Sequence, residues 1–353
     1  MDAPPSGRKA GGTATWRTVL LGILCSGIFL HFALRKVHLA ESWAVLAQLR
    51  FSALLLPISA SVTSLALRGW RWQQIFPPEA RPSCWTSTQI LVVSTAINNV
   101  VPGRGGDLAR CLLVSERISL VGVSLALATL AVEKIVDGFA LLAVVLLSCL
   151  VLGPPHWVWH LGVAAGVVLG GAALILLLLA CRCTWLIGAV DGVLRRWRLA
   201  RCARLIRQLL VGLAEGLGVL RFPRQIAVVG LLTVAIWIAE AALILGCARA
   251  LHVTISPLHC VVVSAVLGLG LMIPAAPAAV GTYEFFAVSA MRLVAVPSAS
   301  ALAVTVLLHV WVLATTTAAG LMLGGSPLVM RRFRVSQRDR SELSAVPAGV
   351  SEK

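Results

Sequence analysis

Charged side chains are scarce in this sequence. Asp, Glu, Lys and Arg make up 12% of its 353 residues, whereas they make up roughly a quarter of an ordinary soluble domain. Hydrophobic residues reach 59%, and the mean hydropathy is +0.92. This composition excludes an ordinary soluble domain and predicts an integral membrane protein, which we place in the cell (inner) membrane.

The sequence also lacks the short motifs of common catalytic and metal sites. There is no C-x-x-C, H-E-x-x-H, G-x-S-x-G or phosphate-binding loop, and the seven histidines are scattered. Most of the nine cysteines lie in or beside apolar runs, where cysteine behaves as a small hydrophobe. We therefore expect no cofactor, no metal and no enzyme activity. The competing hypothesis is an intramembrane enzyme in which Arg104, Glu133 and Asp137 act on a lipid phosphate.

Six apolar runs are long enough to cross a bilayer, which requires about twenty mostly apolar residues. They cover residues 18–37, 52–70, 121–152, 157–180, 225–251 and 300–324. Two more apolar segments, 87–101 and 257–273 with its continuation to 296, are interrupted by Pro and Gly. The sequence predicts an all-α bundle of about eight membrane segments, which forms one domain over residues 18–325.

The positive charge of this basic chain is concentrated in its loops and tails. The formal net charge is +16, the loop 182–224 carries nine Arg against two acids, and the tail 326–353 carries five more Arg. Lys and Arg mark cytoplasmic loops, so this loop, the polar tail 1–17 and the C-terminal tail are expected in the cytoplasm. Helical spacing of apolar residues in the loop predicts an amphipathic helix on the anionic inner leaflet. No nucleic-acid partner is expected.

The number of crossings limits how the two interrupted segments pass through the bilayer. If every segment crossed, the basic loop 182–224 would lie outside, against its charge. We therefore expect residues 87–117 to enter from the cytoplasmic side and turn at 102–106. Residues 257–296 would enter from outside and turn at 274–281. Both termini are then cytoplasmic.

Each interrupted segment places an acid directly after its break. Asp107 follows the first break, and Glu284 follows the second, which contains Pro274 and Gly281. Inverted repeats with broken helices indicate the binding site of a transporter near the midplane. Irregular backbone at that depth must be buried in protein or line a cavity. The alternative is two unrelated Pro/Gly-rich loops at the surface.

The first break is built from residues that permit a tight turn: Pro102, Gly103, Gly105 and Gly106. Such a turn leaves backbone N–H groups free at the start of the helix from Asp107 onward, where a phosphate is favoured. Arg104 and Arg110 are expected to clamp that phosphate with their planar guanidinium groups, and the alternative is that they extend toward the interface. Asn98 and Asn99 are expected to cap freed backbone groups, with headgroup contact as the alternative.

Three charged residues lie inside a predicted span, where each would cost roughly 2.5–3.5 kcal/mol at the bilayer centre. Glu133 and Asp137 lie one helical turn apart on one face, and Lys134 is beside them. Either this is a self-neutralising cluster, paired with the arginines of the first break, or one acid binds a proton or a headgroup ammonium. The candidates in the second half are Glu240, Glu284 and Arg292, whereas His309 is expected to be a helix-packing histidine.

Three stretches resemble the signatures of a known family. They are residues 98–110 (NNVVPGRGGDLAR), 133–137 (EKIVD) and 274–284 (PAAPAAVGTYE). They are similar to the flippase-like integral membrane proteins related to the transmembrane region of lysylphosphatidylglycerol synthase, and the resemblance covers residues 15–325. The sequence departs from the family pattern at Asp107, where Glu is usual, and at Lys134, where Arg is usual. Alanines also replace glycines in the second break.

The resemblance implies that the protein translocates a lipid or a lipid-linked precursor between leaflets. The lipid headgroup would be that of an aminoacylated phospholipid or of a polyprenyl- or hopanoid-type lipid. Larger relatives carry a soluble catalytic domain, which is not expected here. A third hypothesis is a non-transporting scaffold for a partner synthase.

Overall fold

The protein is a bundle of α-helices, seen here in a computed structural model. The structure describes residues 24, 27–35, 37–101, 104–152, 156–180, 192, 223–273 and 276–324, and these contain no β-strand. The helices are α2 (Leu39–Leu46), α3 (Leu55–Ile75), α4 (Cys84–Val100), α5 (Gly105–Arg117), α6 (Val123–Leu152), α7 (His156–Ala180), α10 (Pro223–Ala250), α11 (Pro257–Gly270), α12 (Thr282–Leu293) and α13 (Ser298–Gly324). Short 3₁₀ helices cover Phe51–Leu54, Pro78–Ala80 and Pro277–Ala279.

The long helices agree with the predicted spans. Phe51–Ile75, Pro223–Ala250 and Ser298–Gly324 are long and apolar enough to cross a membrane. The helices α6 and α7 contain 30 and 25 residues, and about twenty residues are enough for a crossing. The prediction of an all-α polytopic membrane protein is therefore confirmed. Part of the first predicted span, most of the basic loop and both tails lie outside the described residues, so their orientation stays a prediction.

Both interrupted segments form helix–break–helix hairpins. The first consists of α4 and α5, and the second of α11 and α12; the two helices of each hairpin pack against one another. Serine caps begin α4 and α11, because Ser83 accepts a hydrogen bond from Thr86 N–H at 3.1 Å and Ser256 accepts one from His259 N–H at 3.2 Å. The hairpins pack within the bundle, which argues against unrelated surface loops. Entry from opposite faces of the bilayer stays a prediction.

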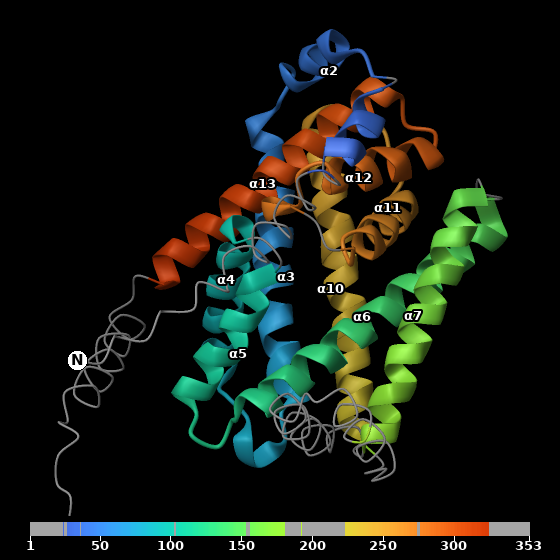
Figure 1. Cartoon of the computed structure of the whole chain (residues 1–353). Helices are drawn as coiled ribbons and strands as arrows, with labels where there is room; N and C mark the ends of the chain where they lie inside the picture. The colour runs from blue at the N-terminus through green and yellow to red at the C-terminus, as the bar shows by residue number, and fades with distance from the viewer. Residues whose placement is uncertain are drawn as a thin grey trace, which may run out of the picture.

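The packing of the helices divides the bundle into two halves of the same design. The helices α3, α4, α5 and α6 correspond in order to α10, α11, α12 and α13. The contact between α3 and α4 matches that between α10 and α11, and the contact between α5 and α6 matches that between α12 and α13. Each hairpin also packs on the last helix of the other half, α4 on α13 and α11 on α6. The equivalent helices α3 and α10 pack along each other in the middle of the bundle (Figure 1). This arrangement is that expected of the predicted pseudo-repeat.

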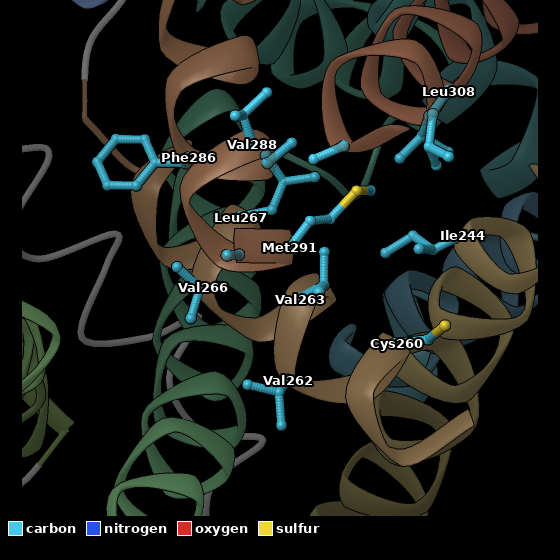
Figure 2. Close-up of a cluster of buried hydrophobic side chains, with 14 of the residues drawn as sticks. Ile244, Cys260, Val262, Val263, Val266, Leu267, Phe286, Val288, Met291 and Leu308 are labelled. Carbon is cyan, nitrogen blue, oxygen red and sulfur yellow. The ribbon is translucent and has the colours of Figure 1, made fainter. Parts of the chain in front are cut away.

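Two apolar clusters hold the hairpins in place. The larger one joins α10, α11, α12 and α13, and Figure 2 shows part of it, with Val263, Leu267 and Met291 among its buried side chains. The smaller one joins the C-terminal end of α3 to α4, α5 and α6 around Trp72 and Val114. The helix α7 lies at the side of the bundle and packs on α6 (Figure 1). Each hairpin is thus held by its own apolar cluster. Polar side chains line the space between the two hairpins.

Candidate functional site

A cavity of about 400 Å³ lies between the two hairpins. Its wall comes from both halves of the bundle and contains many polar and charged side chains. Eight residues predicted for the site line it: Asn98, Asn99, Arg104, Asp107, Arg110, Glu133, Lys134 and Glu240. Pro102, Gly103 and Pro274 lie outside the described residues. Gly106, Asp137 and Glu284 lie behind the wall, each in contact with a residue that forms it, and Gly281 contacts Glu284.

At the first break, Asn98 organises the start of α5. Its Oδ1 accepts a hydrogen bond from the N–H of Gly106 at 2.8 Å, and its Nδ2 donates to Asp107 Oδ1 at 3.2 Å. A Cβ atom at Gly106 would collide with the carbonyl oxygen of Ser94, so only glycine permits this close approach. The capping role predicted for Asn98 is present. The N–H of Gly106 is accordingly engaged by the protein, whereas the prediction of a phosphate at the N–H groups from Asp107 onward stays a prediction.

Two contacts join the first break to the second half. Asn99 Nδ2 donates to the hydroxyls of Thr316 and Thr317 on α13, both at 2.9 Å. Arg104 has left-handed backbone (φ 57°), and its guanidinium donates to the carbonyl oxygen of Leu271 at the end of α11. Arg104 is exposed. It therefore bridges the two hairpins at the edge of the cavity.

A buried ion cluster joins α3, α5 and α6. The side chain of Arg71 is fully buried; its guanidinium donates to both oxygens of Asp137, one of them at 2.8 Å, and lies 3.5 Å from Glu133 Oε1. Arg110 donates to the two oxygens of Glu133 at 3.2 and 2.8 Å. Two guanidinium groups thus neutralise two carboxylates, as a buried cluster requires. This geometry agrees with the hypothesis that the acids of α6 form a neutral cluster with arginines of the first break. Arg110 is such a partner, whereas Arg104 takes no part in the described contacts of the cluster.

Two tryptophans surround this cluster. The guanidinium of Arg110 lies 3.9 Å from the ring centre of Trp72, and Trp237 Nε1 donates to Asp137 at 3.2 Å. Arg71 also donates to the hydroxyl of Thr233 on α10 at 3.0 Å. Arg110 is thus held in place by Glu133 and by the indole of Trp72, and its role as a clamp for an anion stays a prediction.

Two further ion pairs line the cavity. Lys134 Nζ lies 3.8 Å from Asp107 Oδ2, and the lysine side chain is 38% exposed. On the opposite wall, Arg68 donates to Glu240 Oε1 at 3.0 Å, and Ser64 donates to the same oxygen at 2.6 Å. The long distance and the exposure make Lys134 the more available of the two cations for a ligand.

In the second half, His309 and Glu284 form a tight pair. His309 Nδ1 lies 2.6 Å from Glu284 Oε1, and its Nε2 lies 2.8 Å from the carbonyl oxygen of Ala278. Glu284 Oε2 accepts a hydrogen bond from the N–H of Gly281 at 2.6 Å. The imidazole stacks on Tyr283 with 4.1 Å between the ring centres. His309 lines the cavity, so the prediction of a helix-packing histidine describes only part of its role.

The acid–base pairs at the two breaks occupy equivalent positions. Asp107 is the third residue of α5, and Glu284 is the third residue of α12. Their partners, Lys134 and His309, each lie eleven residues after the first residue of α6 and of α13. The same pairing in both halves places the cavity at the centre of the pseudo-repeat.

The family described as the lysylphosphatidylglycerol synthase transmembrane region matches residues 19–320 of the chain. The chain belongs to this family. No curated protein matches the sequence significantly. The match covers both hairpins and every described residue of the cavity wall, so the site lies wholly within the family's membrane domain.

Asp107 and Lys134, the two residues at which the sequence resemblance departs from the family pattern, form an ion pair with each other. Asp107 is shorter than the usual Glu, and Lys134 lacks the fork of the usual Arg. The pair that they form is longer and more exposed than the equivalent pair of Glu284 and His309. The first half of this family member therefore has the looser pair.

Sequence analysis missed Arg68 and Arg71 on α3. The predicted span ended at residue 70, and the stretch 68–72 (RGWRW) is typical of a membrane interface, where Arg and Trp gather. The available signal was the spacing, because residues three or four apart share one face of a helix. The same criterion singled out Glu133 and Asp137. Arg292, a predicted candidate, is exposed and does not line the cavity.

Proposed function

We propose that the protein moves the polar headgroup of a membrane lipid from one leaflet to the other through the cavity between the two hairpins. The observation that most directly supports this proposal is a cavity lined by charged side chains from both halves of a membrane helix bundle. Membership of a lipid-related membrane family supports the proposal. The headgroup would enter the cavity while the acyl chains stay in the hydrocarbon region.

The charged residues divide into fixed and available groups in this proposal. The cluster around Arg71 and Glu133 is buried and neutral, so it holds α3, α5 and α6 together. Lys134 and Arg104 are more exposed and would bind the anionic part of the headgroup, since both present donors to phosphate oxygens. The pseudo-repeat supplies two equivalent hairpins, and movement of one half against the other would open the cavity to alternate sides.

The class of lipid follows from the same chemistry. Exposed cations in the cavity favour a phosphate-bearing headgroup. An aminoacylated phospholipid and a polyprenyl- or hopanoid-type lipid precursor with a phosphate both meet this requirement. The scaffold hypothesis does not require a cavity, and an intramembrane enzyme would change the lipid chemically. Transport therefore makes the distinct prediction that an unmodified lipid changes leaflet.

The proposal is tested by headgroup accessibility in proteoliposomes. A lipid with a fluorescent headgroup is reconstituted with the protein, and a membrane-impermeant reductant destroys only the outer-leaflet fluorescence. Wild type is expected to make the inner-leaflet fraction accessible faster than protein-free vesicles do. Asp107→Asn and Lys134→Met are expected to slow this exchange toward the protein-free rate, because they remove one partner of a pair in the cavity wall.

Glu79→Gln is the matched control, since Glu79 is an exposed acid outside the cavity wall. Its exchange rate should equal that of wild type, and all variants should insert into the membrane at wild-type levels. A wild-type rate no faster than protein-free vesicles contradicts transport. Unchanged exchange in both cavity variants contradicts this site and favours a path elsewhere in the protein.

A further inference from the structure

The contacts of His309 fix how many protons it shares with Glu284. A carbonyl oxygen can only accept, so the 2.8 Å contact with Ala278 requires a proton on Nε2. Nδ1 then faces Glu284 Oε1 at 2.6 Å, and one of these two atoms must also carry a proton. A neutral imidazole and an ionised carboxylate would place two lone pairs against each other. The two contacts together therefore require one proton more than a neutral His309 and an ionised Glu284 carry.

The other charged groups described on the helices that pack against His309 are exposed or paired elsewhere. His309 is the one titratable side chain of α13, whose described packing partners are α2, α4, α10 and α12. Among their acids and bases, Glu41, Arg224, Arg249 and Arg292 are exposed, and Glu240 is paired with Arg68. The helix α4 carries no acid or base. Tyr283 stacks on the ring through its face. The extra proton thus belongs to the Glu284–His309 pair.

This pair also holds a strained turn in the cavity wall. Ala278 and Ala279 both have φ 57°, and Gly281 has φ 85°. Alanine is unfavourable in the left-handed region, so such a turn persists only where its surroundings fix it. His309 fixes it through the carbonyl of Ala278, and Glu284 fixes it through the N–H of Gly281.

We propose that the Glu284–His309 pair is a proton-binding site whose occupancy controls the second-half wall of the cavity. With the proton bound, the turn 276–281 is held against α13. When the proton leaves to water in the cavity, the neutral imidazole has one N–H for two acceptors, Glu284 and the Ala278 carbonyl oxygen, so one of the two contacts is lost and the turn is released. Lys134 stands at the equivalent place in the first half, 3.8 Å from Asp107.

The role of this site in transport rests on the proposed function, whereas the proton-dependent turn does not. During transport, the cavity would be closed on the side of the second hairpin while the proton is bound, and it would open there after the proton leaves. A proton would then be the coupling ion for movement of the lipid headgroup.

The turn is tested by hydrogen exchange measured by mass spectrometry on the full chain in lipid nanodiscs. The scan runs from about pH 5 to about pH 9, the range in which histidine side chains change charge. After correction for intrinsic exchange, peptides covering 276–284 in wild type should exchange about tenfold or more faster at the high end, as expected when hydrogen bonds to a charged group are lost. Peptides from α3 serve as the internal control and should show no such change.

Glu284→Gln is the matched variant, because its amide mimics the protonated acid and cannot ionise. It should keep the turn protected throughout the scan. Uniform protection in wild type, or loss of protection at high pH in Glu284→Gln as in wild type, overturns the proposal. His309→Gln should also remove the pH dependence, and the wild-type scan alone decides the matter if that variant does not fold.

A second measurement separates this inference from the proposed function. Proteoliposomes with a pH difference across the membrane should accumulate the labelled lipid in one leaflet for wild type, whereas Glu284→Gln should show no accumulation. Leaflet exchange without accumulation, together with a pH-independent turn, overturns the proton site and leaves transport standing. A titrating turn in a protein that moves no lipid supports the proton site and contradicts transport.

Discussion

Arg71→Met is expected to lower the free energy of unfolding by about 3–5 kcal/mol, the usual cost of removing one partner from a buried ion pair. The side chain of Arg71 is fully buried and contacts both Asp137 and Glu133. Its removal would leave the carboxylate of Asp137 without a cationic partner inside the bundle. Unfolding of the purified protein by a denaturing detergent, followed by circular dichroism, measures the effect.

Arg68→Met is the matched control on the same helix. Its pair with Glu240 is about a quarter exposed, with 25% and 26% of the two side chains accessible, so its loss should lower the free energy of unfolding by about 1 kcal/mol or less. The double variant Arg71→Met and Asp137→Asn should recover part of the lost stability, because the uncompensated carboxylate is gone and Arg110 keeps its pair with Glu133. Equal effects of Arg71→Met and Arg68→Met would show that the buried cluster does not hold the bundle together.

Thr315→Trp is expected to reduce lipid exchange in proteoliposomes to the protein-free rate. Thr315 lines the cavity from α13, and its hydroxyl bonds only within its own helix, to the carbonyl oxygen of Trp311 at 2.7 Å and to that of Val312 at 3.3 Å. An indole at this position would occupy much of a cavity of about 400 Å³ without removing any charge. Leaflet exchange of the fluorescent lipid measures the effect.

Ala314→Trp provides the control for the added indole. Ala314 is the neighbouring residue, is exposed, and does not line the cavity. Its substitution should leave the exchange rate close to that of wild type. If Ala314→Trp slowed exchange as much as Thr315→Trp, the effect would come from the helix surface, and the headgroup would not pass through the cavity.

The sequence was sufficient to predict the hairpins because their breaks have a strong local cause. Pro and Gly interrupt residues 87–117 and 257–296, and the charge of the loops then requires that the number of crossings be reduced. The acids after the breaks, Asp107 and Glu284, also follow from sequence position. These features depend on neighbouring residues or on simple counting, so one chain reveals them.

The partners of the charged residues could not be predicted in the same way. Arg71 meets Asp137 and Glu133 only because α3 packs against α6, and helix packing depends on side-chain shape over the whole bundle. The sequence offered Arg104 as an equally good partner for Glu133. Arg104 instead reaches Leu271, since the first break lies beside the end of α11.

His309 shows a related limit of sequence reasoning. A single histidine in an apolar helix usually serves packing, and nothing near it in the sequence suggests an acid partner. Glu284 and Ala278 come from the preceding hairpin, and the stacked Tyr283 becomes a neighbour only when α12 folds against α13. The internal repeat was the one available signal, because it relates His309 to Lys134.

The central claim is that lipid headgroups enter the cavity between the hairpins, and photo-crosslinking tests it most directly. A lipid with a photoreactive group on its phosphate-linked headgroup is reconstituted with the full chain, irradiated and mapped by peptide mass spectrometry. The account predicts crosslinks to cavity-lining positions such as Thr95, Lys134 and Ser264, and their loss in Thr315→Trp but not in Ala314→Trp. Crosslinks confined to lipid-facing positions such as Val62 and Leu231, unchanged by Thr315→Trp, would contradict it.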